Sequence, residues 1–484
     1  MTRGSEPNLK RILPAAIIDS PSVPFIFLSS PGLAPGANPG DPHLILAQKT
    51  PIPRFLLVAL LSLFAGGCLK PPPPPGITPL DFYLSSWGTD DKTRSLEMIA
   101  AFEEENPDIK VNLVTINPNA YNERMQTLMV GGIIPDVMMT DPNVYYEWAD
   151  RGLLMDVTDI MDQAAREQKM TFMPIVADEL DYHGRYYAIP YNMCGVILQL
   201  NLDLFRKGGV PIPPVKDITW DWIARVAPQL SRRAGNPNAP CEFFFTMPDM
   251  TSLLFTFGAK IFDDPRNPHK VVVNSPEAAE MCRYVRRLGA TKAVIGRAEM
   301  TTSSNTAVEQ LFARKQAPAR IHGLWDRPGL YGIPVGFDFD VRPFPAGPTG
   351  LRITANGAYL LGIPPHARHA AAARRFVRFF LSPRGIRINC RTGEYLPLFR
   401  EMLPSMVMPP DAPPSWRYYI DTMEAGACCF PVNGPGLAEL RRIIDGRLGQ
   451  VSAEPDVPIP VILKTLEDEI GRWLDDQKQN GFYR

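Results

Sequence analysis

Six polar and aromatic residues stand in loops that follow expected strands, and their side chains could bind a carbohydrate. These residues are Trp87, Tyr121, Asp141, Asn192, Trp325 and Tyr395. Aromatic rings stack on the apolar C–H faces of a sugar. Sugar hydroxyls need fixed donors and acceptors, because burying them unpaired is costly. A cleft lined by these residue types would supply both.

Some of these residues also have an ordinary structural interpretation. Tyr121 could equally be the first residue on the buried face of a helix, and Asp141 could be a plain turn residue before Pro142. Trp325 is the strongest candidate, because a large aromatic residue in a glycine-containing loop has little core to fill. Trp220, in Thr-Trp-Asp-Trp, is better explained by packing at the start of a helix, so we do not assign it to the site.

The sequence lacks the motifs that commonly mark an enzyme or a metal site. It contains no His-Glu-x-x-His, no Gly-x-Ser-x-Gly and no Gly-x-x-x-x-Gly-Lys loop, and its seven cysteines match no zinc or redox spacing. We therefore expect no catalytic residue, metal or cofactor. Carboxylates facing each other across a cleft could still form a glycosidase. A second open alternative is an anionic ligand, which is suggested by Arg320, His322, Arg327 and Arg352.

Composition limits the number of cores and the kind of partner. A chain of 484 residues is too long for a single core, so we expect two or more lobes. The formal net charge is −1, with 45% hydrophobic and 21% charged residues. This balance gives no basic excess for binding nucleic acid or an anionic membrane surface.

Strand-like and helix-like segments alternate in the first part of the chain. We expect strands at Asp81–Leu84, Lys110–Ile116 and Val137–Thr140, separated by helices. This alternation predicts a parallel, doubly wound sheet, which binds ligands at the carboxyl ends of its strands. Further on, we expect a strand at Tyr186–Ile189, stopped by Pro190, and a second strand at Val196–Leu200.

The order of short motifs resembles the extracellular solute-binding proteins of ABC transporters, in the group that binds sugars. The resemblance runs from about Pro79 to the C-terminus and rests on order and spacing, since no single motif is specific. The matching segments include Pro107–Val111, Pro135–Val137, Gly152–Asp156, Gly184–Pro190, Asn201–Phe205, Thr219–Asp221 and Thr392–Pro397.

The resemblance implies an α/β, two-lobed periplasmic-binding-protein (Venus-flytrap) fold, each lobe a mixed sheet flanked by helices, with an interlobe hinge. It places lobe 1 at 77–192 plus 342–383 and lobe 2 at 193–341 plus 384–484. It adds Cys194, Gly323, Asn356 and Gly357 to the residues that line the cleft. Asn356 departs from the family pattern, which has Gly-Gly here.

The N-terminal region is predicted to direct export and lipid anchoring. Residues 1–48 are expected to be disordered or a mis-assigned extension. Residues 49–68 read as a signal peptide with the apolar run Phe55–Phe64, which is too short to span a bilayer. Its small residues before Cys68 resemble a bacterial lipobox, with Ala65 where leucine is usual, so Cys68 would carry the lipid. Residues 69–76 form a proline-rich tether.

The sequence therefore predicts a monomeric, extracytoplasmic lipoprotein that is not an enzyme. It would capture a mono- or oligosaccharide between its lobes and deliver it to ABC transporter permease subunits. A surface-attached carbohydrate-active enzyme, and a binding protein for a phosphorylated polyol or a peptide, remain the alternatives.

Overall fold

The computed structural model describes residues 74–86, 89–193, 195–246, 249–295, 311–323, 336–353, 358–391, 393, 395–405, 414–424 and 432–483. All of them belong to one compact unit, Pro72–Arg484. The predicted signal peptide, Cys68 and almost all of the proline-rich tether lie outside the described residues.

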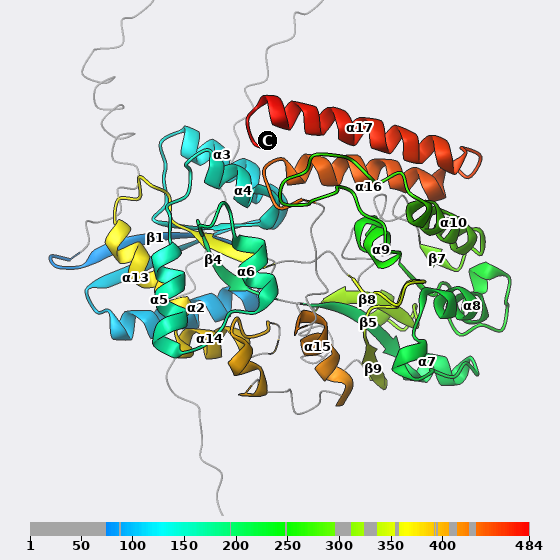
Figure 1. Cartoon of the computed structure of the whole chain (residues 1–484). Helices are drawn as coiled ribbons and strands as arrows, with labels where there is room; N and C mark the ends of the chain where they lie inside the picture. Colours follow the sequence, from blue (N-terminus) through cyan, green and yellow to red (C-terminus); the bar gives the residue numbers. More distant parts are fainter. Residues whose placement is uncertain are drawn as a thin grey trace, which may run out of the picture. The chain divides into compact units, whose positions relative to one another are not determined.

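A five-stranded sheet forms the first half of the fold (Figure 1). Its order is β2 (Ile109–Ile116), β1 (Thr78–Ser85), β3 (Val137–Thr140), β10 (Tyr359–Gly362) and β4 (Ile189–Asn192). The first three strands are parallel, as the alternation of strands and helices predicts. β10 returns from far along the chain and runs antiparallel to both of its neighbours, so the sheet is mixed.

The prediction that Pro190 ends a strand is wrong. Pro190 lies inside β4, opposite Leu360 of β10. β4 is an edge strand with a single partner, so the missing N–H of a proline can face away from the ladder.

An aromatic core holds the first sheet against its helices. Phe376 packs edge-on against Phe82 and Phe102, with ring centroids 5.2 and 4.9 Å apart. The helices around this core are α2 (Thr89–Glu105), α3 (Tyr121–Val130), α4 (Pro142–Asp150), α5 (Thr158–Gln168), α6 (Pro174–Leu180), α13 (Ala370–Phe380) and α14 (Pro383–Cys390), with short 3₁₀ turns at Pro118–Ala120 and Arg400–Ser405.

Residues after 383 do not all pack where the sequence places them. The side chains of Ile386, Cys390 and Leu396 belong to the first core, although we assigned 384–484 to lobe 2. Ser382 follows the end of α13, and its hydroxyl caps α14, which turns back onto α2. A Ser-Pro pair marks a helix boundary and does not show to which core the next helix returns.

Two smaller sheets, one of three strands and one of two, are separate from the first. β5 (Val196–Asn201) lies between β8 (Ala319–Gly323) and β9 (Phe339–Arg342), antiparallel to both, and β6 (Phe245–Thr246) pairs with β7 (Val294–Ile295) in parallel. Within β5, Ile197 packs in the first core, whereas Leu198 and Leu200 pack in the second. Because successive side chains point to opposite faces, one strand joins both cores.

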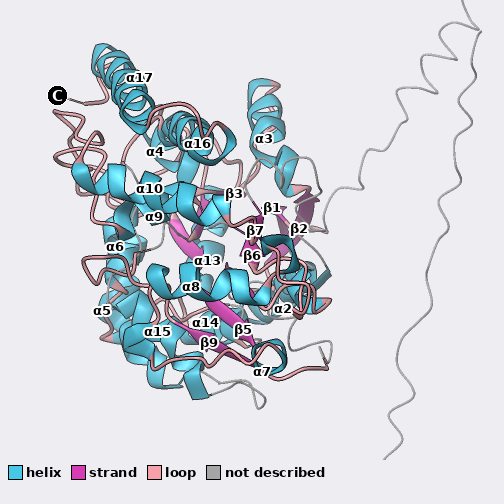
Figure 2. Ribbon diagram, turned by 90° about the vertical axis from the view of Figure 1, so that its right-hand side faces the viewer, coloured by secondary structure: helices cyan, strands magenta, loops and turns pink. Residues whose placement is uncertain are grey.

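The second core is mainly helical. Its helices are α7 (Leu202–Lys207), α8 (Trp220–Leu230), α9 (Met250–Thr256), α10 (Pro276–Ala290), α16 (Leu437–Ala453) and α17 (Ile459–Gln479), with 3₁₀ turns at Val215–Asp217 and Arg232–Ala234. α16 and α17 run side by side, and helices flank the strands (Figures 1 and 2). A further segment, a 3₁₀ turn at Pro414–Arg417 followed by α15 (Tyr418–Glu424), contacts β9 and β5.

Side-chain caps explain several helix starts. Asn201, Thr219 and Ser275 each accept a hydrogen bond from a backbone N–H in the first turn of the helix that follows. Trp220 is buried against Phe245 and Tyr284, which confirms that it serves packing. Among the described residues, no helix is both long enough and apolar enough to cross a bilayer.

Candidate functional site

The structure describes five of the ten predicted binding residues. These are Tyr121, Asp141, Asn192, Gly323 and Tyr395. Predictions for Trp87, Cys194, Trp325, Asn356 and Gly357 fall outside the described residues.

Tyr121 is a core residue. Its side chain is buried, and its hydroxyl lies 2.9 Å from the carbonyl oxygen of Met139 and 3.1 Å from that of Tyr83. Burial raises the pKa of the Tyr121 hydroxyl well above its usual value. Tyr121 therefore ties α3 to β1 and β3, and the packing interpretation describes it better than ligand contact.

Asn192, Tyr395 and Gly323 are also buried and engaged within the protein. The Asn192 side-chain oxygen accepts a 3.0 Å hydrogen bond from the Tyr359 N–H. Arg94 donates a 3.0 Å hydrogen bond to the Tyr395 hydroxyl. Gly323 ends β8 opposite Val196. A binding role for these three residues stays a prediction.

Two of the three arginines that suggested an anionic ligand, Arg320 and Arg352, bind the protein itself. Arg352 donates to the backbone oxygens of Val215, Ile218 and Phe344. Arg320 donates to the side chain of Gln199 at 2.6 Å. Arg327 lies outside the described residues, and Arg320 and Arg352 have structural roles that need no ligand.

Asp141 stands where a sheet of this kind binds ligands. It follows β3 directly and caps α4, its Oδ1 accepting a 2.8 Å hydrogen bond from the Asn143 N–H. Its Oδ2 accepts a 2.8 Å hydrogen bond from the side-chain amide of Asn122. Asp141 is thus both a helix cap and the centre of a small polar cluster at the carboxyl end of the parallel strands.

Three polar atoms around Asp141 are buried and have no hydrogen-bond partner among the described residues. They are Thr140 Oγ1, Asn122 Oδ1 and Asn143 Oδ1. Native proteins leave few buried polar groups unpaired, so each such group needs an explanation. Amide oxygens accept hydrogen bonds, and ligand hydroxyls or bound water would supply the donors.

Arg441 brings a positive charge from the second core to this cluster. It lies on α16, which contacts α4, and its Nη2 atom is inaccessible to solvent although the residue as a whole is half-buried. Desolvation lowers the pKa of the Arg441 guanidinium, while four carboxylates act in the opposite direction: Asp249, Glu179, Asp445 and Asp141. The site therefore combines charged groups from both cores.

Asp249 and Glu179 hold two of these carboxylates in place. Asp249 caps α9 and accepts hydrogen bonds from the Ser252 N–H at 2.9 Å and the Ser252 hydroxyl at 2.5 Å. Glu179 is 4% exposed and accepts one long hydrogen bond of 3.4 Å from the Ala358 N–H. Burial raises the pKa of Glu179 to about 8.

Glu179, Asp249 and Arg441 are absent from the sequence-based prediction. Arg441 had a detectable signal, because it falls on the helical stripe of Leu437, Ile444 and Leu448, all of which are buried. A charged residue on an apolar stripe points to a buried polar contact. Nothing comparable marked Glu179, since its burial comes from the tertiary packing of α6 and Ala358.

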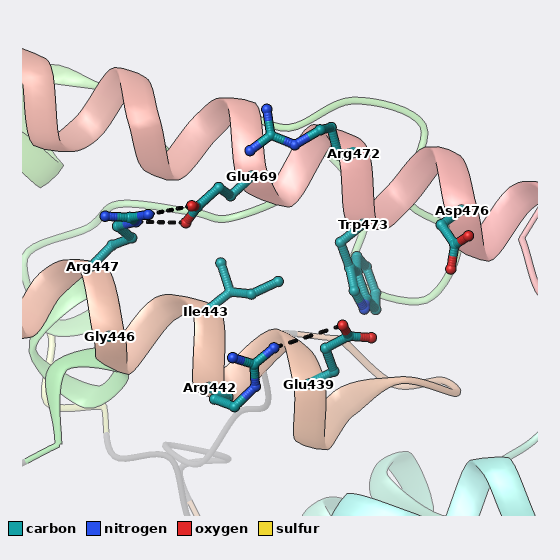
Figure 3. Close-up of a pocket in the computed structure, with 9 residues that line it drawn as sticks. All are labelled: Glu439, Arg442, Ile443, Gly446, Arg447, Glu469, Arg472, Trp473 and Asp476. Atoms are coloured by element: carbon teal, nitrogen blue, oxygen red, sulfur yellow. Dashed lines mark hydrogen bonds and ion pairs between the residues drawn. The ribbon is translucent and has the colours of Figure 1, made fainter.

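A separate surface groove lies between α16 and α17, with a volume of about 530 Å³. Figure 3 shows its lining: three arginines, three carboxylates, Ile443, Gly446 and Trp473. Arg447 and Glu469 form a two-point ion pair there, with Nε 2.6 Å from Oε2. Its charges neutralise one another, so the groove offers less to a polar ligand than the cluster at Asp141. Among the described residues, no group of histidine, cysteine and carboxylate side chains could hold a metal ion.

The chain forms two cores that share one strand. Charged groups from both cores lie beyond the carboxyl end of β3. This arrangement is that of a two-lobed ligand-binding protein. The sequence model of the bacterial extracellular solute-binding proteins matches residues 87–386, which is more than half of the chain. The chain belongs to this family.

Individual relatives are distant in sequence. An uncharacterised lipoprotein of Streptomyces antibioticus is 23% identical over 366 residues, covering 70% of this chain and 75% of its own. An ABC substrate-binding protein of Listeria monocytogenes, solved with cycloalternan, has a TM-score of 0.69 and 22% identity, covering 82% of this chain and 99% of its own. The GacH receptor of Streptomyces glaucescens, solved unliganded and with acarbose, has a TM-score of 0.68 and 18% identity, covering 84% and 99%. These structural similarities show that the chain has the periplasmic-binding-protein fold.

Proposed function

We propose that this protein is the substrate-binding component of an ABC importer and captures a carbohydrate between its two lobes. The observation that carries the proposal is the set of buried, unpaired acceptors around Asp141, at Thr140, Asn122 and Asn143. A polyol presents several hydroxyl donors in fixed positions, which is what such a set of acceptors requires. The sugars in the two structural relatives support the same class of ligand.

The charge around the site favours a neutral ligand. Asp141, Asp249 and Asp445 all act electrostatically on the guanidinium of Arg441. A phosphorylated polyol would bring further negative charge into this region and would be repelled. The site therefore supports an uncharged sugar or sugar alcohol better than the anionic alternative.

Closure of the lobes would couple binding to transport. Asp141 caps α4, which packs in the first core, whereas Arg441 lies on and Asp249 caps a helix of the second. A ligand that contacts both sets favours the closed arrangement through those differential contacts, and the permease would recognise that arrangement. Trp325, Trp87, Asn356 and Gly357 are proposed to complete the site.

A thermal-shift screen tests the proposed function. The panel contains maltose, maltotriose, acarbose, mannitol, glucose 6-phosphate and glycerol 3-phosphate. A ligand that binds only the folded state raises the melting temperature. We expect a neutral sugar to raise it and the two phosphates to leave it unchanged. A shift only with the phosphates would favour the anionic class, and release of smaller sugars from maltotriose would favour an enzyme.

Membrane anchoring through Cys68 is a separate proposal, supported by the small residues before Cys68 and by the name of the lipoprotein relative. Cys68→Ala should release the protein from the membrane fraction or block its processing. Unchanged fractionation together with an unmodified Cys68 in the wild type would rule the anchor out.

A further inference from the structure

The groove between α16 and α17 has hydrogen-bonding capacity that the protein itself does not use. Among the described residues, Arg472 forms no hydrogen bond and no ion pair, and Figure 3 marks no bond from it to the rest of the lining. The carboxylate of Asp476, one turn further along α17, accepts only a long 3.4 Å hydrogen bond from the side chain of Asn480. A free cation and a nearly free carboxylate therefore stand one helical turn apart on the same side of the groove.

Trp473, which also lines the groove, has an unpaired donor. It is 4% exposed, and its indole Nε1 has no solvent access and no hydrogen-bond partner among the described residues. Figure 3 shows the ring extending from α17 toward Glu439 in the first turn of α16. Glu439 is held loosely, since its ion pair with Arg442 is 3.8 Å long and both side chains are mostly exposed. A buried donor without an acceptor needs an explanation, and a partner in the groove would supply the acceptor.

Gly446 keeps the groove open on the side of α16. It lies in the interior of that helix, where glycine is less favourable than alanine. A Cβ atom added there would meet no heavy atom within 4 Å, so packing within the protein does not require a glycine. Glycine does let the backbone of another element approach closely. Ile443, one turn earlier, adds a half-buried apolar side chain that such an element could cover.

We propose that this groove is the surface on which the membrane permease docks, and that the permease fills it with an amphipathic helix. An apolar residue of that helix would cover Ile443, and an acid and a base one turn apart would face Arg472 and Asp476. The balanced charges of the groove suit such a mixed-charge segment better than a small polar ligand. α16 also contacts α4 of the first core, so the docked helix would lie on an element that meets the other lobe. The identity of the partner rests on the proposed function.

Crosslinking in cells tests the docking surface without any sugar. The full-length protein carries the photoreactive residue p-benzoylphenylalanine in place of Ile443, or in place of the exposed Arg225 on α8 as a control outside the groove. Irradiation of the cells from which the protein comes should join the first variant, and not the control, to an integral membrane subunit with an ABC permease sequence, identified by mass spectrometry. Adding Arg472→Glu should reduce this product at least tenfold, whereas Arg472→Lys should keep it. A crosslink to a second copy of the chain, or no crosslink to a permease subunit, overturns the inference.

Uptake measurements separate docking from sugar binding. Gly446→Leu fills the groove, because the space beyond its Cβ is empty, and leucine favours a helix. The purified variant should bind the sugar with wild-type affinity, while cells that carry it should take up that sugar at least tenfold more slowly. Wild-type uptake by the folded variant overturns the inference, and so does a loss of sugar affinity, since the groove would then act on the binding site. If the wild type binds no sugar but still crosslinks to the permease, the carbohydrate part of the proposed function is contradicted and the docking surface stands.

Discussion

Two arginines on the same helix have opposite environments. Arg441 of α16 faces the first core, where its Nη2 is shielded from water and four carboxylates act on it, and desolvation lowers its pKa. Arg447, six residues later, lies in the groove between α16 and α17 with a third of its side chain exposed. There, hydrogen bonding to Glu469 raises the pKa of Arg447.

The difference shows that burial and the number of partners decide what a charged residue does. The pair of Arg447 and Glu469 is complete in itself and partly screened by water, so it fastens two helices of one lobe. Arg441 is shared among acids from two lobes, and the polar atoms around Asp141 stay unpaired. A region with unmet hydrogen-bonding capacity is the better place for a ligand.

The largest expected effect comes from Arg441→Met. The change leaves Asp141, Asp249 and Asp445 without their shared cation, and loss of one partner from a buried charge cluster costs several kcal/mol. Because Arg441 is half-buried, we expect about 2 kcal/mol less unfolding free energy in urea, and loss of sugar binding. If the variant is as stable as the wild type and binds sugar with the same affinity, Arg441 lies outside the site.

A smaller effect is expected from Tyr121→Phe. This variant distinguishes a packing role of Tyr121, which lies next to Asn122, from a role in ligand binding. The variant loses one buried hydroxyl that bonds to backbone carbonyls. This should lower the unfolding free energy by about 1 kcal/mol. Sugar affinity in the folded protein should not change, and a tenfold loss of affinity would return Tyr121 to the ligand site.

The smallest effect is expected from Arg447→Met. A partly exposed ion pair contributes about 0.2–1 kcal/mol, and salt screens it. The loss of unfolding free energy should shrink as sodium chloride is raised from 0.05 to about 1 M, over which the screening length falls severalfold. A loss as large as that of Arg441→Met would remove the contrast between the two arginines.

The sequence predicts the regular elements well where local signals are strong. β3 is found at Val137–Thr140 as predicted, and the buried face of α13 contains Phe376, Phe379 and Phe380. Asn201 and Ser275 cap helices, and such caps are accessible to sequence analysis because a cap depends on a few neighbouring residues.

The sequence-based predictions are wrong where packing between segments far apart in the chain decides the structure. Pro190 is tolerated because β4 became an edge strand, and α14 joined the first core because it packs against α2. Glu179 is buried under Ala358, which is 179 positions away in the chain. Pattern and spacing carry no information about such contacts, so the sequence indicated Asp141 but not the acids and the arginine that surround it.

Sugar binding by Asp141→Ser tests the central claim most directly. Serine can still cap α4, so the melting temperature of the free protein should change little, whereas alanine would also remove the cap. The carboxylate and its link to Asn122 are lost, and leaving buried polar groups unpaired costs about 1–3 kcal/mol. Calorimetric titration with the sugar that stabilises the wild type should therefore show that Asp141→Ser binds it at least tenfold more weakly. The control variant Glu439→Gln, at an exposed site on α16, should bind it with unchanged affinity. Wild-type affinity in Asp141→Ser would contradict the assignment of the binding site to the carboxyl end of β3.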